Sequence, residues 1–165
     1  MRAAPWRGQT QEVIGIAWDD GRIASGSIDT TIRVRAASSG RTLFVLSEPA
    51  GADVNGVAFS PGGERLAAAN QDGIVRVWDL KRRRIARRLR RHDGWSRGVS
   101  WSPDGRLLAS SGSDGEVRIW SPRGGKELRA LQGAAAEVWS VAWSPDGKAL
   151  ASGAGDGTVR LWTFR

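Results

Sequence analysis

The chain has 165 residues, enough for one ordinary domain that buries about two-thirds of its unfolded surface without disulfide bonds. With 40% hydrophobic residues, 25% charged residues and no apolar stretch of roughly 18 residues, the chain is neither disordered nor membrane-spanning. It has no cysteine, no tyrosine and one histidine, which excludes thiol chemistry and leaves few groups for acid–base catalysis. The first residues lack an apolar secretory segment, so we expect a soluble cytoplasmic protein that is not an enzyme and has no cofactor.

The first predicted unit ends near residue 47 and is an imperfect copy of the three that follow. An internal repeat of this length is typical of folds built from one repeated structural unit. Each later unit places an aromatic residue, a turn, an apolar stretch, an aspartate and a tryptophan in one order, at steps of 42: Phe59, Trp101 and Trp143; Asp72, Asp114 and Asp156; Trp78, Trp120 and Trp162. In the first unit Trp18 and Asp29 align with these positions, but the turn is two residues shorter and Arg35 replaces the last tryptophan.

Turn chemistry predicts the secondary structure inside each unit. Ser-Pro-Asp-Gly at 102–105 and 144–147, and Ser-Pro-Gly-Gly at 60–63, supply the proline and glycine that tight turns need, so each is expected to join two antiparallel strands. Residues 74–78, 117–120 and 159–162 alternate β-branched or aliphatic residues with arginine, which is typical of strands. Further apolar stretches at 43–46, 85–89 and 128–131 complete four strands per unit, and the predicted class is all-β.

Four-stranded units of this length, Ser-Pro-Asp-Gly turns and the Asp-Gly-x-Val-Arg-x-Trp ending resemble the WD-repeat family across residues 13–162. The resemblance implies a β-propeller with blades at about 1–47 (degenerate), 48–91, 92–133 and 134–165, the last without its outer strand. It also implies a non-enzymatic scaffold for protein–protein contacts. Part of a larger bacterial multidomain protein, with a regulatory or sensor role, is a further interpretation.

The resemblance assigns a hydrogen-bonded chain to the third unit, through His92, Ser110, Asp114 and Trp120. The other turn aspartates are Asp29, Asp72 and Asp156. The aligned positions before the first strand of the other units are Arg7, Ala50 and Ala134, which cannot relay in the same way, and Ala68 lacks the hydroxyl. Those units are therefore expected to rely on packing.

Several motifs are better explained by structure than by chemistry. His92, Ser110 and Asp114 could suggest a hydrolytic triad, but Ser–Asp pairs recur in other units without any base. The glycine-rich segment 153–157 has no following helix, so a tight turn is expected rather than a phosphate loop. No metal site is expected, because no ligand cluster has a known spacing. Six tryptophans that could stack bases are instead predicted to be core residues: Trp18, Trp78, Trp101, Trp120, Trp143 and Trp162.

Partner binding is expected at the rim of the central channel. The resemblance places it at the start of each first strand, at Ile14, Asn55, Arg97 and Trp139, and just before each turn aspartate, at Ile28, Gln71, Ser113 and Gly155. These residue types resemble those of protein interaction hot spots, and Trp139 is the strongest single candidate. Packing against the neighbouring blade is an equal alternative for Trp139.

The net charge of +8 comes from residues 81–91, which hold eight cations and no acid, while the remaining 17 cations balance 17 anions. This basic segment falls on the outermost strand of the second unit, where charge deters strand-to-strand aggregation. The alternative is a nucleic acid or other polyanion, with six to eight phosphate contacts and a log–log salt slope of roughly −5 to −7. The arginines concerned are Arg82, Arg83, Arg84, Arg87, Arg88, Arg90 and Arg91.

Four units are fewer than the seven that commonly close such a ring, and an open arc would expose two apolar faces. Three solutions are a closed four-bladed ring, two chains forming an eight-bladed ring, or a fragment of a longer propeller. We favour the last two. Residues 1–12 are expected to supply the missing outer strand of the fourth unit, from the same chain or a second one.

Overall fold

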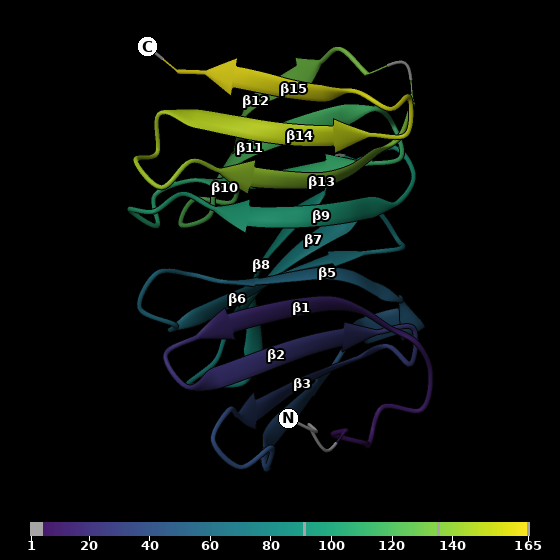
Figure 1. Ribbon diagram of the computed structural model, residues 1–165, viewed down its shortest axis with the longest axis vertical. Helices are drawn as coiled ribbons and strands as arrows, with labels where there is room; N and C mark the ends of the chain where they lie inside the picture. The colour runs from purple at the N-terminus through teal and green to yellow at the C-terminus, as the bar shows by residue number, and fades with distance from the viewer. Residues whose placement is uncertain (1–4, 91, 135, 165) are drawn as a thin grey trace.

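The computed structural model describes residues 5–90, 92–134 and 136–164, which form four antiparallel sheets in chain order (Figure 1). Each sheet is a meander of consecutive strands. The first sheet contains β1 (Val13–Asp19), β2 (Arg22–Ser27), β3 (Thr31–Ala36) and β4 (Thr42–Ser47); the second β5 (Val54–Phe59), β6 (Arg65–Asn70), β7 (Ile74–Asp79) and β8 (Arg84–Arg90); the third β9 (Ser96–Trp101), β10 (Leu108–Gly112), β11 (Glu116–Ser121) and β12 (Lys126–Gln132); the fourth β13 (Val138–Trp143), β14 (Ala149–Ala154) and β15 (Val159–Thr163). One 3-10 turn, Pro49–Gly51, joins the first two sheets. The all-β prediction is confirmed.

The predicted Ser-Pro turns form by a shared mechanism. The Ser102 hydroxyl donates to Asp104 at 2.6 Å and accepts the Leu107 N–H at 2.9 Å, and Ser144 repeats both contacts one unit later. The shorter turn of the first sheet uses a different solution. Asp20 and Gly21 both have positive φ, at 27° and 77°, as a two-residue hairpin turn requires.

The four sheets stack face to face, with the first strands β1, β5, β9 and β13 as neighbours (Figure 1). We call the face of each sheet that points toward its N-terminal neighbour the leading face and the opposite face the trailing face. Bulky residues of the first strand, such as Phe59 and Trp101, lie on leading faces. Small first-strand residues and the aliphatic residues of the third strand lie on trailing faces. Three core clusters fill the three junctions between consecutive sheets.

The stack is an open arc, with the first and the fourth sheets at opposite extremes of the molecule (Figure 1). A closed four-bladed ring was one expectation, and it is wrong because the first and last sheets lie at opposite ends of the stack. The described N-terminal residues follow the first sheet, where Gln9 bonds to Ser25. Within the described ranges the fourth sheet has only three strands, so these residues do not supply its outer strand in the same chain.

The tryptophans expected in the core divide by position in the stack. Trp78, Trp101 and Trp120 are buried at the inner junctions, and Trp143 and Trp162 are half-buried in the last sheet. Trp18 is 69% exposed, so its assignment to the core is wrong. It occupies the same position as Trp101, but in the described part of the chain no sheet precedes the first one to cover its ring.

Candidate functional site

A β-bulge marks the start of the first strand in every sheet. The strand pairing skips one residue at each bulge, since Gly56 pairs with Ala69 and Val54 with Asn70, leaving Asn55 without a partner across the ladder. Bulges re-aim a side chain and often lie beside functional sites. The skipped residues are the four expected first-strand rim residues: Ile14, Asn55, Arg97 and Trp139.

The second set of expected rim residues lies beside the first. In each sheet the backbone N–H of this second rim residue donates to the carbonyl of the residue two positions before the bulged residue, over 2.8–3.0 Å. The donors are Ile28, Gln71, Ser113 and Gly155, and the acceptors are Glu12, Asp53, Trp95 and Glu137. The acceptor positions were missed in the sequence, although they also recur at a regular step. Three of the four are acidic and the fourth is tryptophan.

The third and fourth sheets bring an arginine between two indoles at this rim. The Arg97 guanidinium carbon lies 4.4 Å from the centre of the Trp95 ring and 4.2 Å from that of Trp139. Its Nη2 donates to Glu137 at 2.6 Å. Cation–π stacking links the guanidinium to both indoles, yet Trp95 and Trp139 remain 42% and 52% exposed. Two fixed aromatic surfaces therefore face solvent beside a carboxylate.

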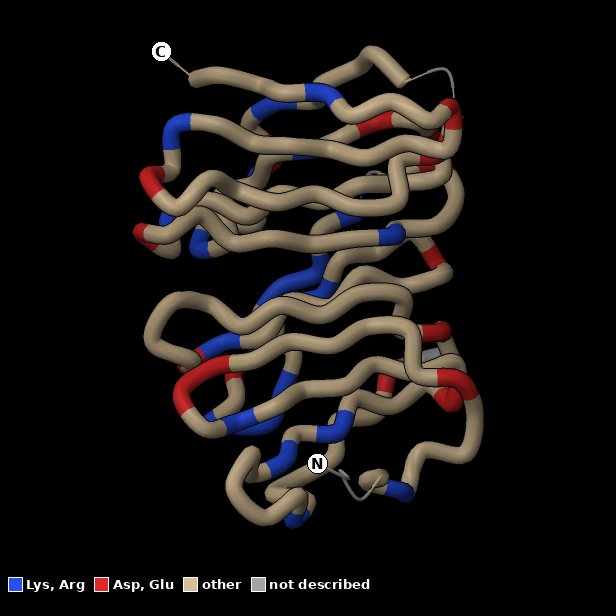
Figure 2. The backbone as a smooth tube through the Cα atoms, in the orientation of Figure 1, with Lys and Arg blue, Asp and Glu red and all other residues tan. Residues whose placement is uncertain are grey.

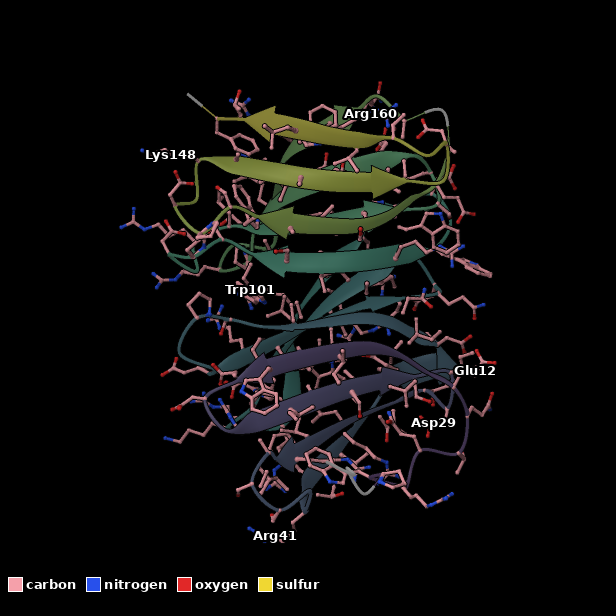
Figure 3. The ribbon with its side chains drawn as sticks, in the orientation of Figure 1. Glu12, Asp29, Arg41, Trp101, Lys148 and Arg160 are labelled. Carbon is pink, nitrogen blue, oxygen red and sulfur yellow. The ribbon has the colours of Figure 1, made fainter. Side chains whose placement is uncertain are left out.

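Acidic side chains gather at the same end of the sheets. Figure 2 shows several acidic positions along the edge where the first strands begin, besides those in the turns at the opposite edge, and Figure 3 labels Glu12 and Asp29 at the first of these edges, with Lys148 at the other. The turn aspartates lie at this end because each one caps the hairpin between the second and third strands. Asp29 accepts the N–H groups of Thr10 and Thr31, for example. The rim is thus aromatic and acidic.

In the third sheet the four side chains of the implied hydrogen-bonded chain are in contact. His92 Nε2 lies 2.7 Å from Ser110 Oγ, Trp120 Nε1 donates to the same oxygen at 2.8 Å, and His92 Nδ1 lies 3.0 Å from Asp114. Burial alone would raise the pKa of the Asp114 carboxyl, but the bond to His92 and two backbone N–H donors outweigh it and lower the pKa below 3.8.

The first two sheets contain polar links of other kinds, so the expectation that they rely on packing alone is wrong. In the second sheet Trp78 Nε1 donates to Glu48 at 3.2 Å, and Arg76 joins Glu48 to Asp72. Burial raises the pKa of Glu48 despite the attraction of Arg76 and the Trp78 hydrogen bond. The link comes from Glu48, just before the 3-10 turn of the connection, and not from the aligned position Ala50, whose side chain lies outside what the structure describes.

The first sheet uses Gln9, two residues beyond the expected Arg7. The Ser25 hydroxyl donates to Gln9 Oε1 at 2.8 Å, while Gln9 Nε2 donates to the Ser25 carbonyl at 3.1 Å. Arg35, which replaces the tryptophan, donates to the Arg7 carbonyl. In the fourth sheet Trp162 Nε1 donates to Ser152 at 3.0 Å. An amide, a carboxylate and an imidazole therefore occupy one structural position in three sheets.

These links are structural rather than catalytic. Ser110 is fully buried and its oxygen is shared by His92 and Trp120, so this hydroxyl cannot reach a substrate. Segment 153–157 spans the end of β14 and most of the turn that leads to β15. Among residues 5–90, 92–134 and 136–164, no three potential ligands are grouped to hold a metal ion. No helix in the same ranges is long and apolar enough to cross a membrane.

The basic segment lies where it was expected, on the connection to β8 and along β8, the outermost strand of the second sheet. Part of its charge is used within the fold. Arg82 pairs with Asp79 at 2.8 Å, Arg83 stacks on Phe44, and Arg87 donates to the Arg123 carbonyl. Arg84, Arg88 and Arg90 are exposed along the strand, and Arg91 lies outside the described residues.

Sequence comparison agrees with this architecture. The model of the WD domain, G-beta repeat (WD40) matches residues 40–79, 83–121 and 125–163. The chain belongs to the WD40 repeat family. Each matched stretch of this WD40 protein runs from the fourth strand of one sheet to the third strand of the next, so the sequence repeat and the sheet are offset by one strand.

Curated relatives that match part of this WD40 chain include the following two proteins. A subunit of chromatin assembly factor 1 from Mus musculus is 28% identical over 82 residues, which cover 48% of this chain and 14% of that protein. WD repeat-containing protein 26 homolog of Arabidopsis thaliana is 43% identical over 61 residues, which cover 36% of this chain and 10% of that protein. The matched segments are therefore a small part of each relative's length.

Proposed function

We propose that this WD40 protein is a non-enzymatic scaffold that binds other proteins or peptides through the aromatic, acidic rim. WD40 repeats in general serve as protein-interaction scaffolds. The observation that supports the finer proposal is the set of four bulges, each of which leaves one first-strand residue without a partner across the ladder at the same end of its sheet. The centre of the contact surface is the Trp95–Arg97–Trp139 cluster.

The chemistry of the rim also suggests the partner. Exposed indoles favour apolar or aromatic side chains, and rigid tryptophans are frequent hot spots. The nearby acidic residues Glu12 and Asp53 favour a cationic segment through electrostatic complementarity. A peptide that combines basic and apolar residues fits this surface best.

Affinity capture with matched variants tests the proposal. Trp139→Ala removes a half-exposed indole from the rim, and Leu128→Ala, whose parent side chain is 47% exposed on the outer strand β12, is the control. We expect wild type and Leu128→Ala to retain the same proteins, and Trp139→Ala to weaken a purified partner about 30-fold, the effect of a hot spot of about 2 kcal/mol. Equal binding by both variants would remove the rim from the proposal.

A second candidate function is polyanion binding, favoured by the exposed arginines of β8. Because Arg82, Arg83 and Arg87 already have partners, three phosphate contacts by Arg84, Arg88 and Arg90 would give a log–log salt slope of about −2.7. A titration of duplex DNA at several salt concentrations measures this slope. A slope near zero, or binding unchanged by Arg88→Gln, would exclude this candidate.

A further inference from the structure

The two ends of the arc expose apolar surface that every inner junction buries. On the leading face of the first sheet, Ile16 is 72% and Trp18 69% exposed, whereas Val57 and Trp101, their counterparts in later sheets, are 7% and 8% exposed. On the trailing face of the fourth sheet, Val159 and Leu161 are 80% and 70% exposed. Their counterparts one unit earlier, Val117 and Ile119, are 1% and 2% exposed.

The two open faces are complementary in the size of their side chains. At the inner junctions bulky leading residues pack against small trailing residues. A side chain at Gly26 would collide with Val54 and Val57, and Trp101 Nε1 donates to the Ala58 carbonyl at 3.1 Å. The open leading face carries the bulky partners, Ile16 and Trp18. The open trailing face carries the small ones, since Ser140 and Ala142 align with Gly56 and Ala58 after two repeats of 42 residues.

The exposed area also exceeds that of a self-contained domain. The accessible surface is 9037 Å², whereas a folded monomer of this mass, 17.7 kDa, exposes ~7,900 Å². The excess of about 1,100 Å² is comparable to the ~800 Å² that each partner buries in a stable protein interface. Covering the two faces would bring the chain back to an ordinary surface area.

The N-terminal residues follow the path of an outer strand from a preceding sheet. At an inner junction the Arg87 side chain of β8 packs on Gly125, in the turn before β12. At the open end Trp6 packs in the same way on Gly40, in the turn before β4. A sheet placed against the open leading face would therefore meet this segment at its outer edge, where β15 lacks a neighbour.

We propose that a second copy of this chain covers both open faces at once. The trailing face of each fourth sheet packs on the leading face of the other copy's first sheet, and the two contacts are related by a two-fold axis. Such head-to-tail contacts close after two copies, because eight sheets lie within the usual four to eight blades of a propeller. One partner species then satisfies both faces, with Trp18 placed opposite Ala142 of the second copy.

Molar mass in solution tests the pairing. The 165-residue chain is expected at about 35 kDa by light scattering at micromolar concentration, twice its 17.7 kDa. Leu161→Arg places a charge on the open trailing face and is expected to halve the mass. Leu128→Arg, on the exposed outer strand β12, is expected to leave the mass unchanged. Circular dichroism checks that both variants stay folded. A wild-type monomer, or a polymer larger than two copies, would overturn the proposal.

A disulfide cross-linking experiment tests which faces meet. Because the chain has no native cysteine, only the introduced thiols can form a disulfide. At the first junction a Cβ on Gly15 would lie 3.1 Å from the Val57 backbone nitrogen, and Ser140 and Ile16 hold the corresponding positions at the open faces. Ser140→Cys alone and Ile16→Cys alone should each give no covalent dimer on oxidation, whereas their mixture should give a disulfide-linked species near 35 kDa. Equal cross-linking of each variant with itself would contradict the head-to-tail arrangement.

Discussion

At the scale of single residues, different side chains make an equivalent polar link in different sheets. His92, Glu48 and Gln9 each link the connection before a sheet to the interior of that sheet. The pKa of Asp114 is lowered by its partners, whereas the pKa of Glu48 is raised because burial outweighs its partners. The two carboxylates therefore contribute oppositely to the pH dependence of stability. The stabilisation of the fold by Asp114 is present above pH 3.8 and is lost in acid. Burial of Glu48 destabilises the fold least in acid, where its carboxyl is protonated.

Replacing Asp114 tests the third-sheet link. We expect Asp114→Ala to lower the free energy of unfolding by about 2 to 3 kcal/mol at pH 7, since it leaves His92 and two N–H donors without their acceptor. The difference from wild type should shrink as the pH falls below 3.8, because protonation removes the same charge. Urea denaturation at pH 7 and pH 3 measures both. Asp156→Ala, at the solvent-facing equivalent position, should cost less, and a pH-independent difference would contradict the assignment.

Backbone strain distinguishes one residue of the first sheet. Thr30 has a φ of 66°, unfavourable for a β-branched residue, where the other three sheets have glycine. Thr30→Gly is expected to raise the free energy of unfolding by about 0.5 to 1 kcal/mol in thermal denaturation, since relief of strain exceeds the entropy that glycine adds to the unfolded chain. The reverse change, Gly157→Thr at a φ of 79° with open space around it, should destabilise the chain. A loss of stability in Thr30→Gly would show that no strain is stored there.

At the scale of elements, the sequence was sufficient wherever local chemistry decides the structure. The Ser-Pro turns and the third strands, in which arginine alternates with aliphatic residues, were predicted because the residues that determine them are adjacent in the sequence. The four bulged residues were expected at the rim through the family resemblance. The bulges themselves depend on how the strands pair, which the sequence does not reveal. The Arg97 cluster could not be predicted, because Trp95, Glu137 and Trp139 meet only after two sheets have packed.

The arginines of β8 are expected to keep an edge strand from aggregating. Unpaired N–H and C=O groups on an outer strand invite pairing with another chain, and charge opposes this. A triple change of Arg84, Arg88 and Arg90 to threonine should leave the melting temperature nearly unchanged but increase light scattering severalfold on incubation. The same change at Arg106 and Arg123, outside this strand, serves as the control. Equal scattering from all samples would show that the charges have another purpose.

At the scale of the whole molecule, the position of each tryptophan in the stack decides its exposure, and the repeat alone cannot reveal this. Trp18 and Trp101 are equivalent in sequence but differ in exposure by about 60 percentage points, since only one has a preceding sheet. The four units were predicted, but how the ring closes was left as three alternatives for the same reason. Ring closure depends on the accumulated angle between sheets, to which each residue contributes only slightly.

Quenching by iodide should therefore reveal two classes of indole. Trp6, Trp95 and Trp139 are about half exposed to solvent, whereas Trp78, Trp101 and Trp120 are at most 8% exposed. We expect a downward-curving Stern–Volmer plot in native buffer that becomes linear in concentrated urea. A linear native plot with full quenching would contradict burial of the inner indoles.

The three-stranded last sheet has a consequence for the order in which the molecule comes apart. Its third strand lacks an outer neighbour in the described chain, and one of its faces has no packing partner there, so opening it breaks fewer contacts than opening an inner sheet. In the single chain, which the Leu161→Arg variant is expected to provide, amide hydrogens of β13 to β15 should exchange with deuterium sooner than those of β6, β7, β10 and β11. The chain would then unfold from its fourth sheet inward, and the slowest-exchanging amide protons would lie in the middle of the arc.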